Sequence, residues 1–278
     1  MSNARKLADN LPRQGAFANR SVIMNGEFMV DQRNNGAAVI PTSTYYQLTL
    51  DRWAAGVSQA SKVKYERGGG SVTPPAGFKT YLAMTQNGST YTPTTNDIFD
   101  VAQYIEGYDT AKFDFGTSTA KNLVVSFWAR SNVTGTYGIY VTNKAANRIF
   151  VNSYTISAAN TWEYKTVSIT GDTTGTWLTT NDTGLRIGWM LSAGSGRLTS
   201  ANAWNASADY AVTGQVNLLG TSNGYLYLTG CKLEEDQATP FEHEPYHVSL
   251  NKCLRYYFDS KGEATKPYNY ATQYQSTH

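Results

Sequence analysis

The stretch Leu123-Val124-Val125-Ser126-Phe127-Trp128 decides the fold. Only Ser126 is polar, so a strand here would present apolar side chains on both of its faces. β-Branched and aromatic residues favour strands, and a short apolar run of this kind is typical of a strand buried on both sides. The stretch therefore predicts a central strand of a β-sandwich.

Strand-like segments with turn signals between them extend this pattern over most of the chain. Lys62-Val63-Lys64-Tyr65-Glu66 alternates polar and apolar residues, as a half-buried strand does. Asn87-Gly88 and Asn223-Gly224 are typical of tight turns. Many short strands with frequent turns predict an all-β fold, a jelly-roll-like antiparallel β-sandwich over residues 21–258. We predict its strands at residues 21–24, 45–50, 62–67, 80–84, 123–129, 137–142, 149–154, 163–169, 185–191, 212–218 and 225–233, with a further candidate at 99–105.

The composition suits such a fold and narrows the range of partners. The chain has 278 residues, 13% of them aromatic and 16% charged, and a net charge of +2. No basic stripe marks a nucleic-acid partner. No apolar run approaches the ~20 residues that a membrane-spanning helix needs, so we expect no membrane insertion. The first residues lack the apolar core of a signal peptide, which favours synthesis in a cytoplasm.

The two ends of the chain differ from the predicted sandwich. Residues 1–20 form an N-terminal arm in which Leu7 and Leu11 share one helical face, and we predict that this arm docks on a partner, with a flexible lead as the alternative. Near the other end, Leu250, Cys253 and Leu254 have helical spacing, with Ser249 as the expected N-cap. A final strand at 255–258 is the alternative to the end of this helix. Residues 259–278 form a C-terminal tail.

One metalloenzyme motif occurs, at His243-Glu244-Pro245-Tyr246-His247. The H-E-x-x-H motif binds Zn²⁺ because a helix places both histidines on one face. Pro245 lacks the N–H of a helix interior and disfavours the helical conformation at Glu244. We therefore predict a turn here and no metal site.

Signals for catalysis are weak elsewhere. The three histidines all follow residue 242, and no nucleophile elbow occurs. Loop carboxylates leave open a polysaccharide-cleaving pair or a structural calcium ion. These carboxylates are Asp97, Asp100, Glu106, Asp109, Glu234, Glu235 and Asp236. We predict no catalytic residue and no cofactor. Cys231 and Cys253 are expected to be buried thiols, with a single disulfide as the alternative.

Aromatic side chains are better candidates for ligand binding. Trp204 and Tyr210 lie in a polar stretch with few other apolar residues. An exposed aromatic ring covers the apolar face of a sugar well, so we predict that these two residues bind a glycan. The alternative is that they cap the core from a long loop. The pattern around Trp177 does not distinguish an exposed ring from a ring that packs on the core.

Motifs near both ends of the sequence are more specific than the composition. Near the N-terminus stand Asn25-Gly26-Glu27-Phe28, Asp31-Gln32-Arg33 and Asp51-Arg52-Trp53. Near the C-terminus stand Leu233-Glu234, Ala238-Thr239-Pro240-Phe241-Glu242 and Cys253-Leu254-Arg255-Tyr256-Tyr257. Between them lie Val125-Ser126-Phe127-Trp128-Ala129-Arg130 and Gly171-Asp172-Thr173-Thr174-Gly175-Thr176-Trp177.

Together these motifs resemble bacteriophage tail-fibre and receptor-binding proteins with a carbohydrate-binding-module-like β-sandwich. Lys232 stands where such proteins usually have Gln, and Glu235-Asp236 replace a small residue and a glycine. The resemblance implies a virion structural protein on a tail fibre or tail tip, which binds other virion proteins and host-surface glycans and forms homotrimers. It also implies that Trp177 belongs to the framework. A capsid head fibre or decoration protein, a polysaccharide depolymerase and a free carbohydrate-binding module are the alternatives.

Overall fold

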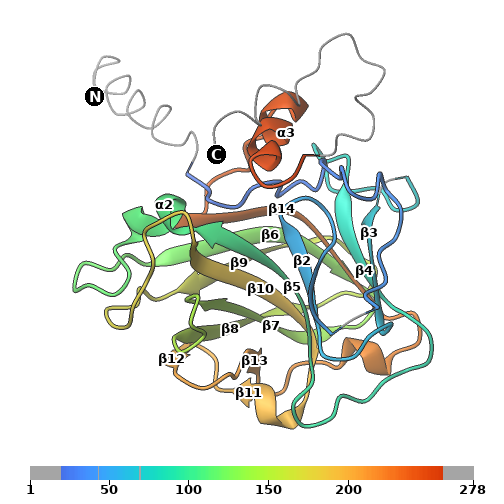
Figure 1. Ribbon diagram of the computed structural model, residues 1–278. Helices are drawn as coiled ribbons and strands as arrows, with labels where there is room; N and C mark the ends of the chain where they lie inside the picture. The colour runs from blue at the N-terminus through green and yellow to red at the C-terminus, as the bar shows by residue number, and fades with distance from the viewer. Residues whose placement is uncertain (1–19, 43, 69, 259–278) are drawn as a thin grey trace, which may run out of the picture.

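Two antiparallel β-sheets pack face to face in the computed structural model, which describes residues 20–42, 44–68 and 70–258 (Figure 1). The antiparallel β-sandwich expected from the sequence is confirmed. Among the described residues, no helix is long and apolar enough to cross a membrane. Leu7 and Leu11 of the predicted docking arm and the tail at 259–278 lie outside the described residues.

The first sheet has five strands in the order β3-β4-β14-β6-β9. Their bounds are β3 Val63–Gly68, β4 Tyr81–Gln86, β6 Leu123–Ser131, β9 Glu163–Ile169 and β14 Tyr225–Glu235. Strand β6 contains the apolar stretch quoted above and pairs with β14 on one side and β9 on the other. The predicted central strand is thus confirmed.

The second sheet has seven strands in the order β1-β2-β5-β10-β7-β8-β12. They are β1 Tyr45–Leu48, β2 Trp53–Val57, β5 Ile98–Glu106, β7 Gly135–Thr142, β8 Ile149–Ile156, β10 Thr183–Ala193 and β12 Ala203–Asn205. Two short strands, β11 Leu198–Thr199 and β13 Ala211–Val212, pair in parallel beyond its outer face. Helical turns connect the strands at α2 Gly107–Thr110, η1 Ala111–Phe113, η2 Ser195–Arg197 and η3 Leu218–Gly220.

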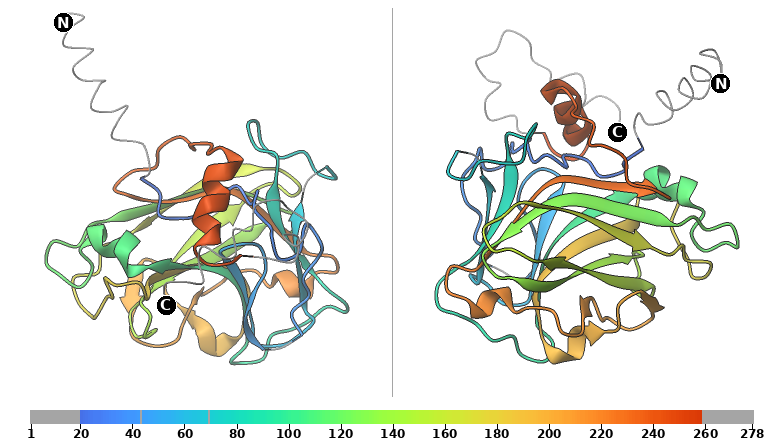
Figure 2. Two further views of the ribbon diagram at one scale, coloured as in Figure 1. Left: turned by 45° about the horizontal axis from the view of Figure 1, so that its top comes forward. Right: turned by 180° about the vertical axis from the view of Figure 1, so that it is seen from behind.

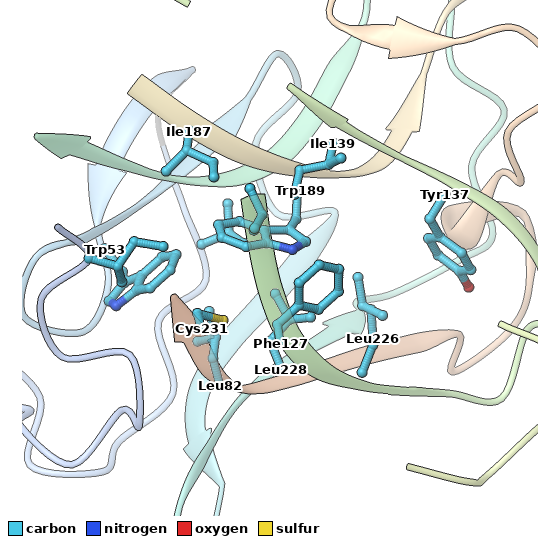
Figure 3. Close-up of a cluster of buried hydrophobic side chains, with 14 of the residues drawn as sticks. Trp53, Leu82, Phe127, Tyr137, Ile139, Ile187, Trp189, Leu226, Leu228 and Cys231 are labelled. Carbon is cyan, nitrogen blue, oxygen red and sulfur yellow. The ribbon is translucent and has the colours of Figure 1, made fainter. Parts of the chain in front are cut away.

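The core fills the space between the two sheets (Figure 3). Trp189 of β10 and Phe127 of β6 are fully buried, and their ring centroids lie 5.5 Å apart across the sandwich. Trp53 packs beside Trp189 from β2. Each such buried side chain contributes about 2–3 kcal/mol from the area it removes from water. The alternation of strand side chains places these residues inward.

Two predicted strands differ from the structure, and strand β2 was not predicted. Residues 21–24 are not a strand. The segment nevertheless runs beside β14 where β14 extends beyond its pairing with β4, and the Val22 N–H donates to the Leu233 carbonyl there. Residues 212–218 are a strand only at their start, because the chain turns at Thr213 and Gly214. Strand β2 was missed because Ala54, Ala55 and Gly56 carry little of the strand signal.

The C-terminal helix begins earlier than predicted. Helix α3 spans Tyr246–Leu254 and lies over the outer face of the five-stranded sheet (Figures 1 and 2). Pro245 occupies the N-cap position, so the prediction of Ser249 as N-cap was wrong. Ser249 instead lies inside the helix and donates to the Glu244 carboxylate. Residues 255–258 form a turn and an irregular end rather than the alternative final strand.

Candidate functional site

The motifs from opposite ends of the sequence meet in space. The Gln32 backbone N–H and side-chain amide donate to the two Asp51 carboxylate oxygens at 2.6 and 2.7 Å. The same amide donates to the Tyr257 carbonyl at 3.2 Å. These contacts join segments more than 200 positions apart, and we call the whole group the terminal clasp. Its members are Gln32, Arg33, Asp51, Arg52, Glu106, Arg255, Tyr256 and Tyr257.

Cation–π contacts complete the terminal clasp. The Arg33 guanidinium carbon lies 3.6 Å from the centre of the Tyr257 ring, and that of Arg52 lies 3.4 Å from the centre of the Tyr256 ring. Arg255 forms a two-pronged ion pair with Glu106 at 2.9 and 3.1 Å. Partly desolvated cation–π contacts contribute roughly 0.5–2 kcal/mol each. The clasp therefore fixes the end of α3 against the first half of the chain.

The Ala238–Glu242 motif is explained by a buried ion pair. Lys232 donates to the Thr239 hydroxyl at 2.6 Å and to the Pro240 carbonyl at 2.9 Å. Its ammonium lies 3.1 Å from the Glu234 carboxylate, and both side chains are almost fully buried. The Thr239 hydroxyl also donates to Glu234 at 2.6 Å. Glu235 pairs with Lys121 at 3.2 Å. Glu234 thus holds the turn after β14, whereas Glu235 joins the end of β14 to the loop before β6.

The two histidines of the motif do not share one helix, because α3 begins at Tyr246 and contains only His247. His243 lies before α3, and its Nδ1 is 2.8 Å from the Glu27 carboxylate. Burial raises the pKa of Glu27, although the hydrogen bond to His243 opposes this effect. Within residues 20–258, as far as they are described, no group of three or more His, Cys, Asp and Glu side chains is placed to hold a metal ion.

The loop carboxylates are engaged in local contacts. Asp97 accepts hydrogen bonds from Ser58, Tyr91 and Thr94. Burial raises its pKa, but these hydrogen bonds outweigh it and lower the value to about 2. Glu106 belongs to the terminal clasp. These contacts give Asp97 and Glu106 structural partners, and the absence of a cleavage reaction stays a prediction.

Tyr210 lies in a cluster around a buried arginine. Arg186 of β10 is only 8% exposed, on the face of the seven-stranded sheet that points away from the main core. Its guanidinium carbon lies 5.0 to 5.7 Å from the centres of the Tyr46, Tyr104, Tyr140 and Tyr210 rings. Tyr210 itself is 8% exposed. The expectation of an exposed ring is therefore wrong for Tyr210, and its role in glycan binding stays a prediction.

Asp100 completes this arginine–tyrosine cluster. The carboxyl group is wholly buried and accepts a hydrogen bond from the Tyr140 hydroxyl at 2.5 Å. Burial raises its pKa to about 6, against the opposing charge of Arg186. Nε and Nη2 of Arg186 are buried and have no hydrogen-bond partner among the described residues. The cluster is a charged interior beneath the sheet surface rather than an open cleft.

Trp204 belongs to an aromatic corner at one end of the sandwich. Its ring lies 5.6 Å from Trp177, 5.9 Å from Phe115 and 5.3 Å from Phe150, and its indole N–H donates to the Thr170 carbonyl at 2.9 Å. The ring is half-buried against the edge of the core. Trp204 thus packs on other rings, as the core-capping alternative anticipated, and its glycan role stays a prediction.

A buried aspartate holds the aromatic corner in place. Asp172 is 1% exposed and accepts two hydrogen bonds from Arg148, at 2.6 and 2.8 Å. It also accepts one from the Trp177 indole N–H at 3.1 Å. Burial raises the Asp172 pKa, but the hydrogen bonds from Arg148 and its neighbours outweigh it, so the pKa is lowered. The Gly171–Trp177 motif is therefore a loop anchored at Asp172, in agreement with a framework role.

A cavity of about 130 Å³ opens beside this loop. Phe113, Phe115, Trp177 and Leu185 form its apolar walls, and Asp114 is among its polar lining residues. The sequence did not predict Phe115 and Asp114 as site residues, because no strand or helix pattern marks residues 107–122. The one available signal was the Gly171–Trp177 motif, which supplies the opposite wall.

Comparison with known proteins adds distant structural neighbours. No family model matches the sequence, and no curated protein is significantly similar to it. The enzymatically active domain of tailspike protein 4 of bacteriophage CBA120 is 12% identical, with a TM-score of 0.42 over 78% of this chain and 21% of that chain.

Two carbohydrate-related structures are similarly distant. The family 11 carbohydrate-binding module of a Clostridium thermocellum cellulosomal cellulase is 14% identical, with a TM-score of 0.36 over 73% of this chain and 99% of that one. A putative sugar binding protein from Bacteroides thetaiotaomicron is 14% identical, with a TM-score of 0.39 over 78% of this chain and 100% of that one. The neighbours thus include carbohydrate-binding modules and a phage tailspike domain, at low identity.

Proposed function

We propose that this protein is a bacteriophage virion structural protein, a component of a tail fibre or the tail tip. The observation that carries the proposal is the convergence of the family-like motifs in the terminal clasp. Gln32, Asp51 and Tyr257 hold one another, so residues that the resemblance singles out serve to fix the sandwich against the segment that follows α3. A module whose motifs from both halves of the sequence hold one another suits incorporation into a particle.

Particle location is tested by labelling this protein on intact virions. Gold-conjugated antibody and electron microscopy are expected to place it at the tail. Label on the head would support the alternative, a capsid head fibre or decoration protein. Absence of label from purified virions, with the protein free in the lysate, would contradict a virion role altogether and favour a free carbohydrate-binding module.

We further propose that the protein binds other virion proteins and host-surface glycans, as a homotrimer, without chemical turnover. Trimeric display would convert weak binding at single sites into useful avidity. Light scattering of the purified protein should give three times the 30.6 kDa chain mass. A monomer at all concentrations would contradict the trimer.

Absence of turnover is tested on host polysaccharide. Incubation with the purified protein is expected to release no new reducing ends. Release of reducing ends, lost on Asp100→Asn or Glu106→Gln, would establish a depolymerase that uses a carboxylate pair. The buried ion pairs and hydrogen bonds of the loop carboxylates argue against that alternative.

A further inference from the structure

We propose that the cavity lined by Phe115 and Trp177 binds a single neutral pyranose residue at the end of a glycan. The inference rests on the proposed glycan binding and gives it a site. Trp204 and Tyr210, the glycan-binding residues predicted from the sequence, do not line this cavity. Trp204 does pack against Trp177, which forms one of its walls.

The size and walls of the cavity suit one sugar ring. A volume of about 130 Å³ is slightly below the roughly 150 Å³ of an engineered cavity that holds benzene, so the cavity takes in one face of a pyranose while the ring hydroxyls stay at its rim. Phe115 and Trp177 are both half-buried, and their ring centroids lie 4.8 Å apart at an interplanar angle of 81°. Two rings at a right angle make a corner, in which the apolar C–H face of a pyranose packs on one ring and its edge on the other.

The Trp177 ring is fixed before any ligand arrives. Its indole N–H donates to Asp172 at 3.1 Å, and Trp204 packs against it with an interplanar angle of 82°. The Gly116 N–H donates to the Asp172 carbonyl at 2.7 Å, which joins the loop of Phe115 to the loop of Trp177. Little side-chain freedom is therefore lost on binding, and such preorganisation increases affinity.

The backbone of Gly116 allows this close approach of the two loops. Its φ is +85°, and a Cβ atom at this position would lie 2.8 Å from the Gly175 carbonyl and 3.3 Å from the Trp177 ring. Any larger residue would therefore push the two walls apart.

Polar groups at the rim distinguish a sugar from an apolar side chain of a partner protein. Asp114, Thr117 and Thr179 line the cavity and are exposed. Asp114 has a φ of 56°, and no described ion pair involves its carboxylate. The hydroxyl groups of a sugar can donate hydrogen bonds to this carboxylate. An apolar side chain of a partner protein would displace its water and supply no hydrogen bond in return. The negative charge also disfavours an acidic sugar, so we infer a neutral one.

The test uses the full-length protein and methyl pyranosides of glucose, galactose, mannose and N-acetylglucosamine. Saturation-transfer NMR should detect at least one of them, with roughly millimolar affinity as expected for a single ring. Phe115→Ala and Asp114→Ala should each weaken that binding at least tenfold. Tyr164→Ala removes a ring that is 45% exposed on β9 and serves as the matched control, with binding unchanged.

Each outcome bears on the inference. Failure of all four probes to bind, or equal binding by the wild type and both cavity variants, would overturn it. Far-UV circular dichroism of each variant shows whether the fold is retained, and Asp114→Asn gives a second variant with the same shape if Phe115→Ala unfolds. Virion labelling is independent of these results, so a sugar-free cavity in a tail-located protein would refute only this inference.

Discussion

Asp100 carries a carboxyl group into a wholly buried position between Tyr140 and Arg186. Burial disfavours the charged form and raises its pKa to about 6, from a value of 3.8 for a free side chain. The folded protein therefore binds one more proton than the unfolded chain between about pH 4 and pH 6. The buried Asp100 carboxylate therefore lowers the free energy of unfolding at neutral pH, and this destabilisation becomes smaller as the pH falls.

Replacement of Asp100 by Asn should change how stability depends on pH. In the wild type, Asp100 contributes an increase in the free energy of unfolding as the pH falls through 6, because the pKa is raised in the folded state. A shift of this size corresponds to an upper limit on the order of 3 kcal/mol. Urea unfolding at pH 7 and pH 5 should show a smaller increase for Asp100→Asn. An identical pH dependence in both proteins would contradict the raised pKa.

Both cysteine thiols should be unreactive in the native protein. Cys231 and Cys253 are free and buried, and burial raises the pKa of Cys253 to about 12. Only the thiolate attacks, so a thiol reagent should label neither residue at pH 8 and both after denaturation. Rapid labelling of the native protein would show that α3 does not shield Cys253.

The charge of Lys232 should contribute more to the free energy of unfolding, through its ion pair with Glu234, than the burial of its aliphatic chain does. Lys232→Met leaves the Glu234 carboxylate buried without its counter-charge, which costs about 3–5 kcal/mol. Lys232→Gln restores the residue usual in the resembling proteins and can still donate to Thr239, so its cost should be smaller. Urea denaturation of the two variants measures the difference. Both variants lack the charge of Lys232, so equal losses would show that the donor to Thr239 contributes nothing, and losses well below about 3 kcal/mol in both would show that the charge is immaterial.

Helix α3 shows how an element depends on contacts outside itself. It has nine residues and no side-chain cap, and isolated helices of this length are marginal in water. The terminal clasp supplies the missing stability through Arg52, Tyr256 and Gln32. Most of the helix therefore exists because of residues far away in the sequence.

Loss of the terminal clasp should release α3 while the sandwich remains folded. In the double variant Gln32→Ala and Arg52→Ala, amide hydrogen exchange should accelerate at least tenfold in residues 246–257 and stay unchanged in β6 and β10. Lys64→Ala breaks an exposed ion pair with Glu66 and is the control. Uniform acceleration over the whole chain would instead show that the clasp stabilises the entire fold.

The sequence predicted those elements whose signal is local. The apolar run of β6 and the alternation in β3 identified strands, because side-chain pattern and strand pairing agree there. Strand β2 is rich in Ala and Gly and forms because β1 and β5 flank it. The aromatic corner could not be predicted for a related reason. Phe115 and Trp177 lie on separate loops, which the Gly116–Asp172 hydrogen bond and the packing of the two rings bring together.

At the scale of the whole molecule, a single core joins both sheets. One cluster of buried side chains runs from Val22 to Leu233 and includes strands of each layer. Neither sheet can lose its partner without exposing that core. The described sandwich is thus one cooperative unit.

Thermal unfolding should accordingly show one transition. Fluorescence of the six tryptophans, which include Trp53 and Trp189 in the core, and far-UV circular dichroism should give the same midpoint within about 1 °C. Two separate transitions in the full-length protein would show that the sheets unfold independently.

The segment from Val22 to Gly26 has a consequence for assembly. Its backbone occupies the flank of β14 beyond β4, where the Gly26 carbonyl accepts from the Cys231 N–H. An open flank of this kind is a template onto which a strand of another chain can add, and repeated addition leads to fibrillar aggregates. Because the chain covers this flank with its own backbone, neighbouring copies at high density on a surface would have to touch there through side chains, and so could separate again.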